Sequence, residues 1–409
     1  MKFQGIMWRL VLTVSLLCWR SEGRVTCRNI TSGEVDWFIL YKEPNITKNR
    51  TGLRYVYIDS TTKLPATVYE NIKDPEGVLA NTLQPLFTSM VRVVGPSSNF
   101  GFISYSDQPP GSNAGSDYGH SKGVVMVEKD KTGVWLLHST PQFPFSRNTK
   151  TFWPDSGAKN AQMFICVTFP YKEFEQIGKH LQYIRAFPFD SQVPGNFHPE
   201  LRDAADKVQS PPPKTFQELR SEKGQIFRSF AKQQSDEPGV GDLYVTIAKG
   251  LGSDLHVQHW SCQNDRSYCG FDQKVLNIKN IETPLGTWGT CDHSKWCVAT
   301  NPSTPWSCVA DMNRAKTQYQ RRGGALCIKN EQVQKRFLKF VVGIEDCSTT
   351  ERKRKISSSE SECFLLEKRE KFGLGFVPFL NRAHLAGSDS EVRFFSVLFS
   401  VVLIYLFQS

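Results

Sequence analysis

The sequence predicts an α/β fold, of the α+β kind, in which two related strand-rich halves face one shared site. Three observations lead to this prediction. The tripeptide His-Ser-Lys occurs twice, at 120–122 and at 293–295. Each copy is followed by the same order of strand, turn and second strand. Elsewhere, aromatic and β-branched segments alternate with segments of helical periodicity.

Both copies of the motif lead into a predicted hairpin whose second strand begins at a tryptophan. The first copy is followed by the apolar run 124–127, a charged turn and a strand from Trp135. The second is followed by the run 297–299, a turn that contains prolines and a strand from Trp306. Such a match between distant segments indicates two halves with related structure.

The spacing inside the motif indicates a chemical role. Residues two apart in a β-strand point to the same face, so His120 projects with Lys122 and His293 with Lys295. Two lysines can hold the anionic oxygens of a phosphodiester without a metal, and two histidines can divide nucleophilic attack and proton transfer. A single His-x-Lys is more often an exposed strand edge. The matched hairpins favour phosphodiester cleavage.

The remaining elements follow from local patterns. Continuous apolar or aromatic runs predict strands at 35–41, 53–58 and 163–169. Helical periodicity predicts helices at 172–181, 215–232 and 331–342. The proline-rich segment 210–214 lies near the midpoint between the two motifs and is a natural junction. We therefore expect an N-terminal half over 24–209 and a C-terminal half over 210–347.

The N-terminus reads as a signal peptide over residues 1–23. It has basic residues, an apolar run at 10–19 and small residues before the expected cut. Its removal takes away three basic residues and one acidic residue, which lowers the formal net charge from +10 to +8. The mature chain stays basic, which favours a polyanionic partner such as nucleic acid or an anionic membrane.

Cysteines and glycosylation sequons agree with a secreted chain. Of the 11 cysteines, Cys18 lies in the signal peptide, and the others suggest disulfides. The sequons are at Asn29, Asn45 and Asn49. A zinc site is a weaker alternative, because paired C-x2-C spacing is absent from the sequence. Its candidate ligands would be His256, His259, Cys262 and Cys269.

The C-terminus carries a second sorting signal. Residues 348–393 are charged and serine-rich, which indicates a flexible stalk more than a nucleic-acid contact. Residues 394–409 form a hydrophobic tail whose apolar run is shorter than the ~20 residues that a spanning helix needs. Small residues at 386–388 make a GPI attachment signal as reasonable as a short tail anchor.

A series of motifs in fixed order covers most of residues 27–347. They are Val35-Asp36-Trp37-Phe38 with Tyr41-Lys42, and the segments 83–86, 107–110, 119–123, 135–139, 292–297 and 305–314. Together they resemble the deoxyribonuclease II family, the acid endonucleases of lysosomes and secretions. The resemblance implies a phospholipase D-like fold, a pseudo-dimer of two β-rich halves with flanking helices around one active site.

The resemblance also implies an activity. Family members are metal-independent endonucleases that need no cofactor and leave a 3′-phosphate and a 5′-hydroxyl. One of His120 and His293 would form a phosphohistidine and the other would act as acid, while Lys122 and Lys295 neutralise the phosphate. The two motifs are too alike for the sequence to assign these roles. Two ammonium groups disfavour imidazolium, so we expect an acidic pH optimum.

Lipid cleavage is disfavoured by the residues that follow the motifs. The larger superfamily usually has Asp seven residues after the motif histidine, where this chain has Val127 and Thr300. A lipid phosphodiesterase is therefore a weaker alternative, and it predicts release of lipid head groups. A binding protein or toxin that keeps the fold without catalysis is another alternative, which the intact His-Lys quartet opposes.

Supporting residues are expected around the quartet. Gln142 and Asn313 stand seven residues after the two tryptophans and could bind phosphate, although the family more often has Asn at the first position. Buried structural amides are an equal alternative. His138 could approach the site, or be a buried histidine with a structural role.

The resemblance also implies disulfides. The pairs are Cys27 with Cys166, Cys269 with Cys347, and Cys308 with Cys327. Cys262, Cys291, Cys297 and Cys363 are left over, and a pair between Cys262 and Cys291 stays open.

The expected partner is DNA, held through its phosphate backbone. The expected location is the secretory pathway, ending in the lysosome or outside the cell. Membrane attachment through the tail and a homodimer stay open.

Overall fold

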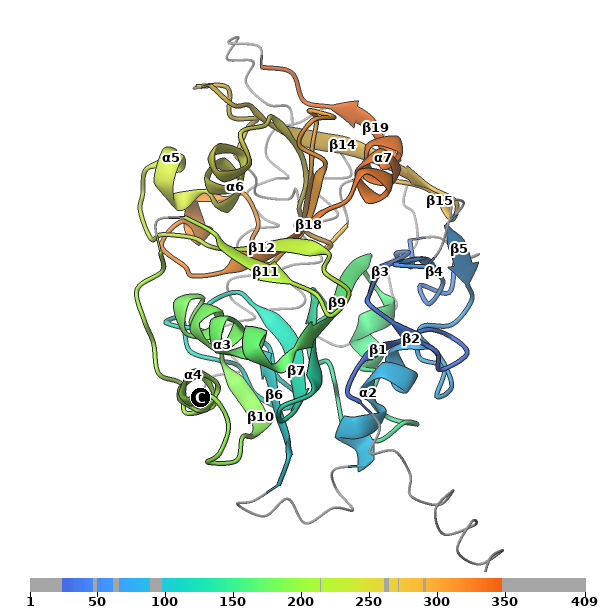
Figure 1. Ribbon diagram of the computed structural model, residues 1–409. Helices are drawn as coiled ribbons and strands as arrows, with labels where there is room; N and C mark the ends of the chain where they lie inside the picture. The colour runs from blue at the N-terminus through green and yellow to red at the C-terminus, as the bar shows by residue number, and fades with distance from the viewer. Residues whose placement is uncertain are drawn as a thin grey trace, which may run out of the picture. The chain divides into compact units, whose positions relative to one another are not determined.

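The computed structural model describes residues 24–46, 50–61, 66–88, 98–213, 215–260, 265–270, 272–289 and 292–347. These residues form an eight-stranded sheet, a nine-stranded sheet and a two-stranded ribbon (Figure 1). The ribbon pairs β1 (Cys27–Arg28) with β2 (Glu34–Val35). The first sheet uses strands up to residue 192 and the second uses strands from residue 217.

The first sheet is antiparallel throughout. Its strand order is β10 (Pro188–Gln192), β6 (Phe100–Ser106), β7 (Lys122–Glu128), β8 (Thr132–His138), β9 (Gln162–Pro170), β3 (Trp37–Lys42), β4 (Tyr55–Asp59) and β5 (Thr67–Tyr69). Strands β6, β7 and β8 are buried along their whole length, which explains their nearly continuous apolar sequences.

The second sheet repeats much of this arrangement. Its strand order is β11 (Gln217–Arg220), β12 (Ile226–Ala231), β18 (Gly324–Lys329), β17 (Trp306–Ala310), β16 (Trp296–Ala299), β13 (Leu255–Gln258), β14 (Val275–Thr283) and β15 (Gly286–Trp288). Strand β19 (Val341–Ile344) also pairs with β14. Only the β13–β14 pair is parallel among the described strands of this sheet.

Helices connect and flank the strands. The described α-helices are α2 (Val78–Thr88), α3 (Phe174–Tyr183), α4 (Pro199–Ala205), α5 (Pro238–Gly241), α6 (Leu243–Leu251) and α7 (Glu331–Phe340). Short 3₁₀ turns lie at η1 (Asp155–Ala158), η2 (Tyr171–Glu173) and η3 (Lys316–Gln318). Asn330 starts α7, because its side chain accepts hydrogen bonds from the first free amides of the helix.

The two halves share one topology, which confirms the predicted α+β pseudo-dimer. In chain order the first half runs β3, α2, β6, β7, β8, β9, α3, and the second runs β12, α6, β13, β16, β17, β18, α7. Within each sheet the matching strands are neighbours in the same order, β6-β7-β8-β9-β3 and β13-β16-β17-β18-β12. The hairpin that follows each His-Ser-Lys motif is therefore the same structural unit.

The hydrophobic core has a central part that both halves build. This central cluster joins Ile39 and Trp135 of the first half to Trp296 and Leu326 of the second. Each half also has an outer cluster of its own, between its sheet and its remaining segments. Helix α3 contacts β12 of the other half. The halves are thus packed through apolar side chains.

Three predicted strands and two predicted helices are confirmed with small shifts at their ends. The predicted strand 35–41 corresponds to β2 and β3, the strand 53–58 to β4, and the strand 163–169 to β9. The predicted helix 172–181 corresponds to η2 and α3, and the helix 331–342 to α7. The predicted helix at 215–232 is wrong. It forms the β11–β12 hairpin, whose turn contains Gly224 at φ 85°. Pairing of β12 with β18 outweighs the helical pattern of this segment.

The motif strands begin later than predicted. β7 begins at Lys122 and β16 at Trp296, so both histidines and Lys295 precede the strands. The reason is visible at His120, whose backbone N–H donates to the Arg322 carbonyl of the other half, 2.9 Å away. A contact between halves replaces the pairing that would extend the strand.

Three disulfides join the pairs that the family resemblance implies. Cys27 is bonded to Cys166, Cys269 to Cys347, and Cys308 to Cys327. Cys297 is a buried free thiol. Cys262, Cys291 and Cys363 lie outside the described residues.

Several predictions concern segments that the structure does not describe. These are the signal peptide 1–23, the stalk 348–393, the tail 394–409 and Asn49. Asn45 is exposed and Asn29 is half-buried, and their glycosylation stays a prediction. The division of the chain at residue 210 also stays a prediction. Among the helices within residues 24–347 that are described, none is long and apolar enough to cross a membrane.

Candidate active site

His120 is oriented by the backbone of the other half. Its Nδ1 lies 2.8 Å from the carbonyl oxygen of Asp311, which follows β17. Because a carbonyl oxygen only accepts, Nδ1 carries the proton and donates it. The neutral ring therefore keeps the lone pair on Nε2, the nitrogen that is left to react.

Asp107 contacts two cationic side chains at the first motif and lies near His120. It follows β6, and its Oδ1 accepts from the Lys122 Nζ at 2.5 Å, while its Oδ2 accepts from Arg321 at 3.0 Å. The same Oδ2 lies 3.7 Å from His120 Nε2. Burial raises the pKa of Asp107, but the charges of Lys122, His120 and Arg321 outweigh it and hold this pKa below its usual range. Asp107 is thus an anion that fixes Lys122.

The second motif is anchored through Asp292, which is fully buried. Its Oδ2 accepts from the Tyr41 hydroxyl on β3 of the first half and from the Trp288 indole at 2.8 Å. Its Oδ1 accepts from the Ser294 backbone at 2.7 Å. Asp292 also pairs with Ala161 of the first half in an isolated β-bridge. Both sides of His293 are therefore held.

His293 packs against an aromatic ring whose position depends on Asn313. The ring centroids of His293 and Trp260 are 4.8 Å apart. The Trp260 backbone N–H donates to Asn313 Oδ1 at 3.2 Å. Lys295 Nζ donates to the His293 carbonyl at 2.8 Å. The structure thus gives Asn313 a positioning contact, and its predicted phosphate contact stays a prediction.

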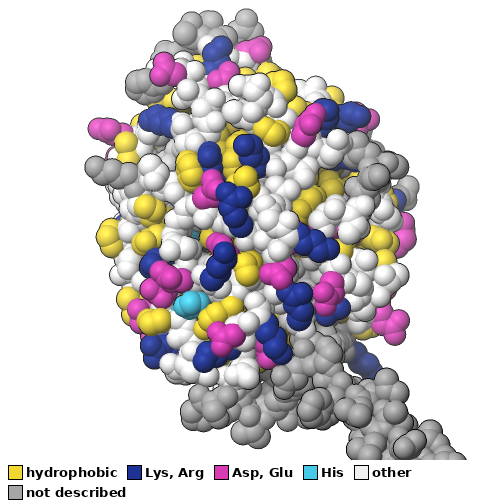
Figure 2. All heavy atoms as spheres, viewed as in Figure 1, with side chains coloured by type: hydrophobic (Ala, Val, Ile, Leu, Met, Phe, Trp, Pro, Cys, Tyr) yellow, Lys and Arg dark blue, Asp and Glu magenta, His cyan; other side chains and the backbone are white. Residues whose placement is uncertain are grey.

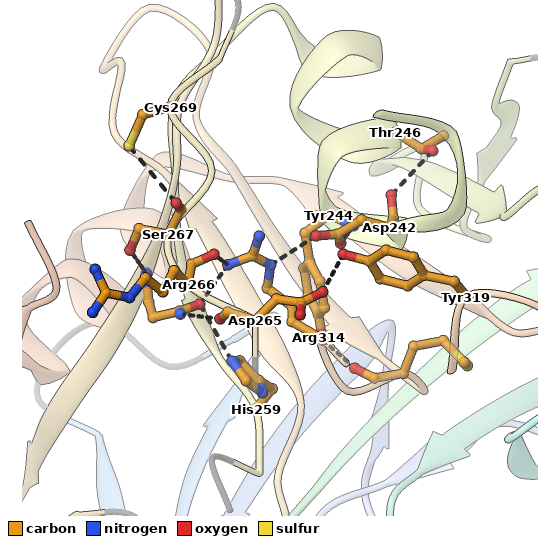
Figure 3. Close-up of polar contacts among 12 residues, drawn as sticks. Asp242, Tyr244, Thr246, His259, Asp265, Arg266, Ser267, Cys269, Arg314 and Tyr319 are labelled. Atoms are coloured by element: carbon orange, nitrogen blue, oxygen red, sulfur yellow. Dashed lines mark hydrogen bonds and ion pairs between the residues drawn. The ribbon is translucent and has the colours of Figure 1, made fainter. Parts of the chain in front are cut away.

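A buried polar network supports the segment that carries Trp260 (Figure 3). Arg314 donates to Asp242 at 2.8 Å and to Asn277 at 2.6 Å. The side chain of Asn277 also lies 3.3 Å from His259 Nε2. The pair of Arg314 and Asp242 is almost completely buried, so losing either partner would leave an uncompensated charge. This network holds the segment of His259 and Trp260, and the Trp260 ring contacts His293.

Electrostatic effects at the two motifs agree with one shared site. Burial is the main cause that lowers the pKa of both histidines. Beyond its own motif lysine, His120 responds to Lys295 of the other half, and His293 responds to Lys122. Backbone contacts also link the motifs, because the Lys295 carbonyl accepts from the Ala310 N–H at 2.9 Å and the Asp311 carbonyl of the next residue lies 2.8 Å from His120 Nδ1.

The surroundings of Lys295 change its pKa. Burial first, and then the charge of Lys122, lower its pKa to about 7. Asp292, Asp107 and Asp311 act in the opposite direction and keep the ammonium form accessible. Two cations that repel one another in a buried site have a high affinity for an anion placed between them.

Two further predicted residues have contacts within the first half. Gln142 has φ 60°, and its side-chain oxygen accepts from Ser156 at 3.1 Å. Its predicted phosphate contact stays a prediction. His138 ends β8 and is buried between Phe143 and Phe164, with ring centroids 4.9 Å and 5.4 Å away. Burial and then the charge of Lys122 lower the pKa of His138, which favours its neutral form.

The alternative zinc ligands do not come together as a set. Cys269 is bonded to Cys347 and has no thiolate to offer. The ring nitrogens of His259 lie 3.1 Å from the Trp260 carbonyl and 3.3 Å from Asn277. Cys262 lies outside the described residues.

The sequence patterns missed two residues that contact the motifs, Asp107 and Tyr41, and one that contacts Asp107, Arg321. Asp107, Arg321 and Tyr41 reach the site from the opposite strand or the opposite half. The nearest sequence signal was Asp107 directly after an apolar run. Arg321 had no local signal, because its place is defined only by the packing of the halves.

The assembled groups suit reactions at a phosphate ester. Two ammonium groups can hold non-bridging oxygens, one imidazole can attack phosphorus, and the other can transfer a proton. Val127, at the position where the larger superfamily usually has Asp, is buried in the central core. The carboxylate that pairs with Lys122 is that of Asp107, which follows β6.

Comparison with known proteins agrees with this chemistry. A family model described as deoxyribonuclease II matches residues 26–347. Deoxyribonuclease-2-alpha of Sus scrofa is 35% identical, covering 83% of this chain and 96% of that protein. Plancitoxin-1 of Acanthaster planci is 33% identical, covering 83% and 97%. The solved structure of a phosphatidylserine synthase of Haemophilus influenzae is 11% identical, with a TM-score of 0.29. The match covers 74% of this chain and 79% of the synthase chain.

Proposed function

Because this chain belongs to the deoxyribonuclease II family, we propose that it is an endonuclease that cleaves DNA at acidic pH without a metal. We further propose a phosphohistidine intermediate and products with a 3′-phosphate and a 5′-hydroxyl. The observation that carries the proposal is the pair of His-x-Lys motifs, one from each half. The lysine of each motif lowers the pKa of the histidine in the other motif. Family membership supplies the substrate, and the paired motifs supply the chemistry.

The reaction has two displacement steps. The unprotonated imidazole of one histidine attacks phosphorus, a P–N bond forms, and the bond to the 5′-oxygen breaks as the other histidine gives that oxygen a proton. The second histidine, now neutral, takes a proton from water, which attacks the phosphohistidine. The P–N bond breaks and leaves the 3′-phosphate. Lys122 and Lys295 neutralise the non-bridging oxygens in both steps.

The charges at the site favour activity in acid. Burial and the two lysines lower the pKa of both histidines, so the protonated histidine that the first step needs is populated only at low pH. The pKa of Lys295, lowered to about 7, means that its positive charge is present below pH 7 and lost above it. Both effects make cleavage fall as pH rises toward and beyond neutrality.

The wider setting is part of the same proposal. Binding through the phosphate backbone would give little sequence preference. A signal peptide, sequons and three disulfides support passage through the secretory pathway to the lysosome or the cell exterior. Membrane attachment by the tail and a homodimer stay predictions.

Replacement of either motif histidine tests the proposal. We expect His120→Ala and His293→Ala each to lower plasmid nicking in EDTA at mildly acidic pH by about 10³-fold or more, because each removes a nucleophile or an acid. His256→Ala, a half-buried histidine on β13, is the matched control and should cleave normally. End-group analysis should find 3′-phosphate and 5′-hydroxyl ends.

The same assay separates the competing functions. Undiminished nicking by either motif variant would refute the catalytic assignment. Retained DNA binding without nicking by the wild-type chain would favour a binding module. Release of head groups from phospholipid vesicles, with intact plasmid, would favour a lipid phosphodiesterase.

A further inference from the structure

Two cations outside the His-Lys quartet occupy equivalent places in the two halves. Lys159 lies in the loop between β8 and β9, three residues before β9 begins at Gln162. Arg321 lies in the loop between β17 and β18, three residues before β18 begins at Gly324. These strand pairs match in the shared topology, and each loop contains a 3₁₀ turn, η1 or η3. Lys159 and Arg321 are therefore related by the pseudo-symmetry.

Each loop runs beside the motif of the opposite half. Ala161, two residues after Lys159, forms a β-bridge with Asp292, the neighbour of His293. The backbone carbonyl of Arg322, the residue directly after Arg321, accepts a hydrogen bond from the His120 backbone N–H at 2.9 Å. Backbone contacts thus bring Lys159 to His293 and Arg321 to His120, independently of any charge effect.

Electrostatic effects agree with these placements. After burial and Lys295, the charge of Lys159 lowers the pKa of His293. After burial and the nearer groups, the charge of Arg321 lowers the pKa of His120. Lys159 is exposed, and a quarter of the Arg321 side chain is exposed, so both can meet a ligand from solvent.

The general surface charge does not by itself trace a path for DNA. The face in Figure 2 carries Lys and Arg side chains interspersed with Asp and Glu. Cations that lie beside the two histidines indicate the path of a DNA strand more specifically than the overall surface charge does. A strand whose scissile phosphate lies between Lys122 and Lys295 extends away from this centre in two directions, and the pseudo-symmetry puts one further cation on each side.

We propose that Lys159 and Arg321 bind the backbone phosphates that flank the scissile phosphate, Lys159 beside His293 and Arg321 beside His120. The inference rests on the proposed function and adds two subsites for a polyanionic strand. Arg321 also donates to Asp107 at 3.0 Å and to the Tyr118 carbonyl at 3.1 Å, so only part of its guanidinium is open to a phosphate. The test is made on Lys159, because replacing Arg321 would also disturb Asp107 beside Lys122.

The decisive experiment compares a long substrate with a minimal one. Lys159→Gln and wild type would be assayed on a single-stranded 20-mer and on the dinucleotide TpT, which has one phosphodiester and no flanking phosphate. We expect kcat/KM for the 20-mer to fall about tenfold, mainly through KM, whereas kcat/KM for TpT should keep its maximal value when each protein is compared at its own pH optimum, since loss of the Lys159 charge also raises the pKa of His293. The slope of log kcat/KM against log salt should become less negative by about 1 for the 20-mer.

Three further variants serve as controls. Lys159→Arg keeps the charge and should keep the salt slope. Lys335→Gln removes an exposed lysine from α7 and should behave as wild type. Arg321→Gln should weaken cleavage of both substrates, because Arg321 also holds Asp107 next to Lys122 and His120.

Several results would overturn the inference. An unchanged salt slope for Lys159→Gln, or an equal loss on TpT and the 20-mer, would exclude a flanking-phosphate role for Lys159. Failure of the proposed function looks different, because the wild-type chain would then cleave neither substrate in EDTA. If wild-type cleavage depends on His293 but Lys159→Gln cleaves the 20-mer as well as wild type, the proposed function stands and only the flanking subsite at Lys159 is refuted.

Discussion

At the scale of single residues, Asp107 shows how one buried carboxylate organises the first motif. Position 127, seven residues after His120, is a buried valine in the core that both halves share. Asp107 reaches Lys122 from the end of the neighbouring strand β6. It also lies close to His120 and Arg321. One carboxylate therefore sets the position of the lysine and the charge around the histidine.

Neutralising Asp107 should move the pH dependence of cleavage in a defined direction. The negative charge of Asp107 raises the pKa of His120, so Asp107→Asn should lower that pKa. We expect a lower kcat, by about 10²-fold as Lys122 loses its anchor, and a shift to lower pH of the limb that His120 controls. The pH–kcat profile is the measurement.

The limb that moves also assigns the role of His120. Movement of the alkaline limb identifies His120 as the proton donor, and movement of the acidic limb identifies it as the nucleophile. The exposed Asp117 of the same loop supplies the matched control, Asp117→Asn, with an unchanged profile expected. A profile of Asp107→Asn that moves to higher pH, or does not move, would contradict the role given to Asp107.

At the scale of elements, the loop that enters β7 is constrained by the other half. A Cβ at Gly119 would lie 1.9 Å from the Ile184 carbonyl oxygen at the end of α3 and 2.9 Å from the Arg322 carbonyl oxygen. Both are backbone atoms, which cannot swing away as a side chain can. The loop before His120 is therefore packed at backbone distance between α3 and the segment before β18.

Adding one methyl group at Gly119 should disturb catalysis more than a mutation of similar size elsewhere. We expect Gly119→Ala to lower the free energy of unfolding by about 1–3 kcal/mol. Displacement of His120 by the clash should lower kcat by about 10²-fold. Urea unfolding and plasmid nicking are the measurements.

A glycine in the same loop provides the comparison. A Cβ at Gly115 would meet nothing within 4 Å, so Gly115→Ala should keep both stability and activity. Wild-type activity in Gly119→Ala would show that the loop can relax without moving His120, against the packing described above.

At the scale of the whole molecule, the two halves depend on one another. The central cluster draws apolar side chains from both sheets, and Tyr41 of the first half holds Asp292 of the second. His120 in turn relies on the Asp311 and Arg322 carbonyls. Neither half completes its own motif, because some of the groups that hold each motif come from across the interface.

This shared core predicts that the halves unfold together. In urea, tryptophan fluorescence, near-ultraviolet circular dichroism and nicking activity should be lost in one transition with a common midpoint. A chain limited to residues 24–209 should lack a cooperative transition and activity. Two separated transitions, or a stable and cooperative N-terminal half, would show that the central cluster contributes less than its burial indicates.

The sequence by itself determined the features that depend on neighbours along the chain. The two hairpins, α3, α7 and the relation between the halves follow from local patterns, because a short strand or an amphipathic helix records its own burial in its residue order. Tertiary structure decided the rest. Residues 217–231 became the hairpin of β11 and β12 because β18 offered a partner, which no local pattern encodes. Asp107, Arg321 and Lys159 lie beside the motifs only in the folded chain, because strand pairing and the packing of the halves bring together segments that are distant in sequence.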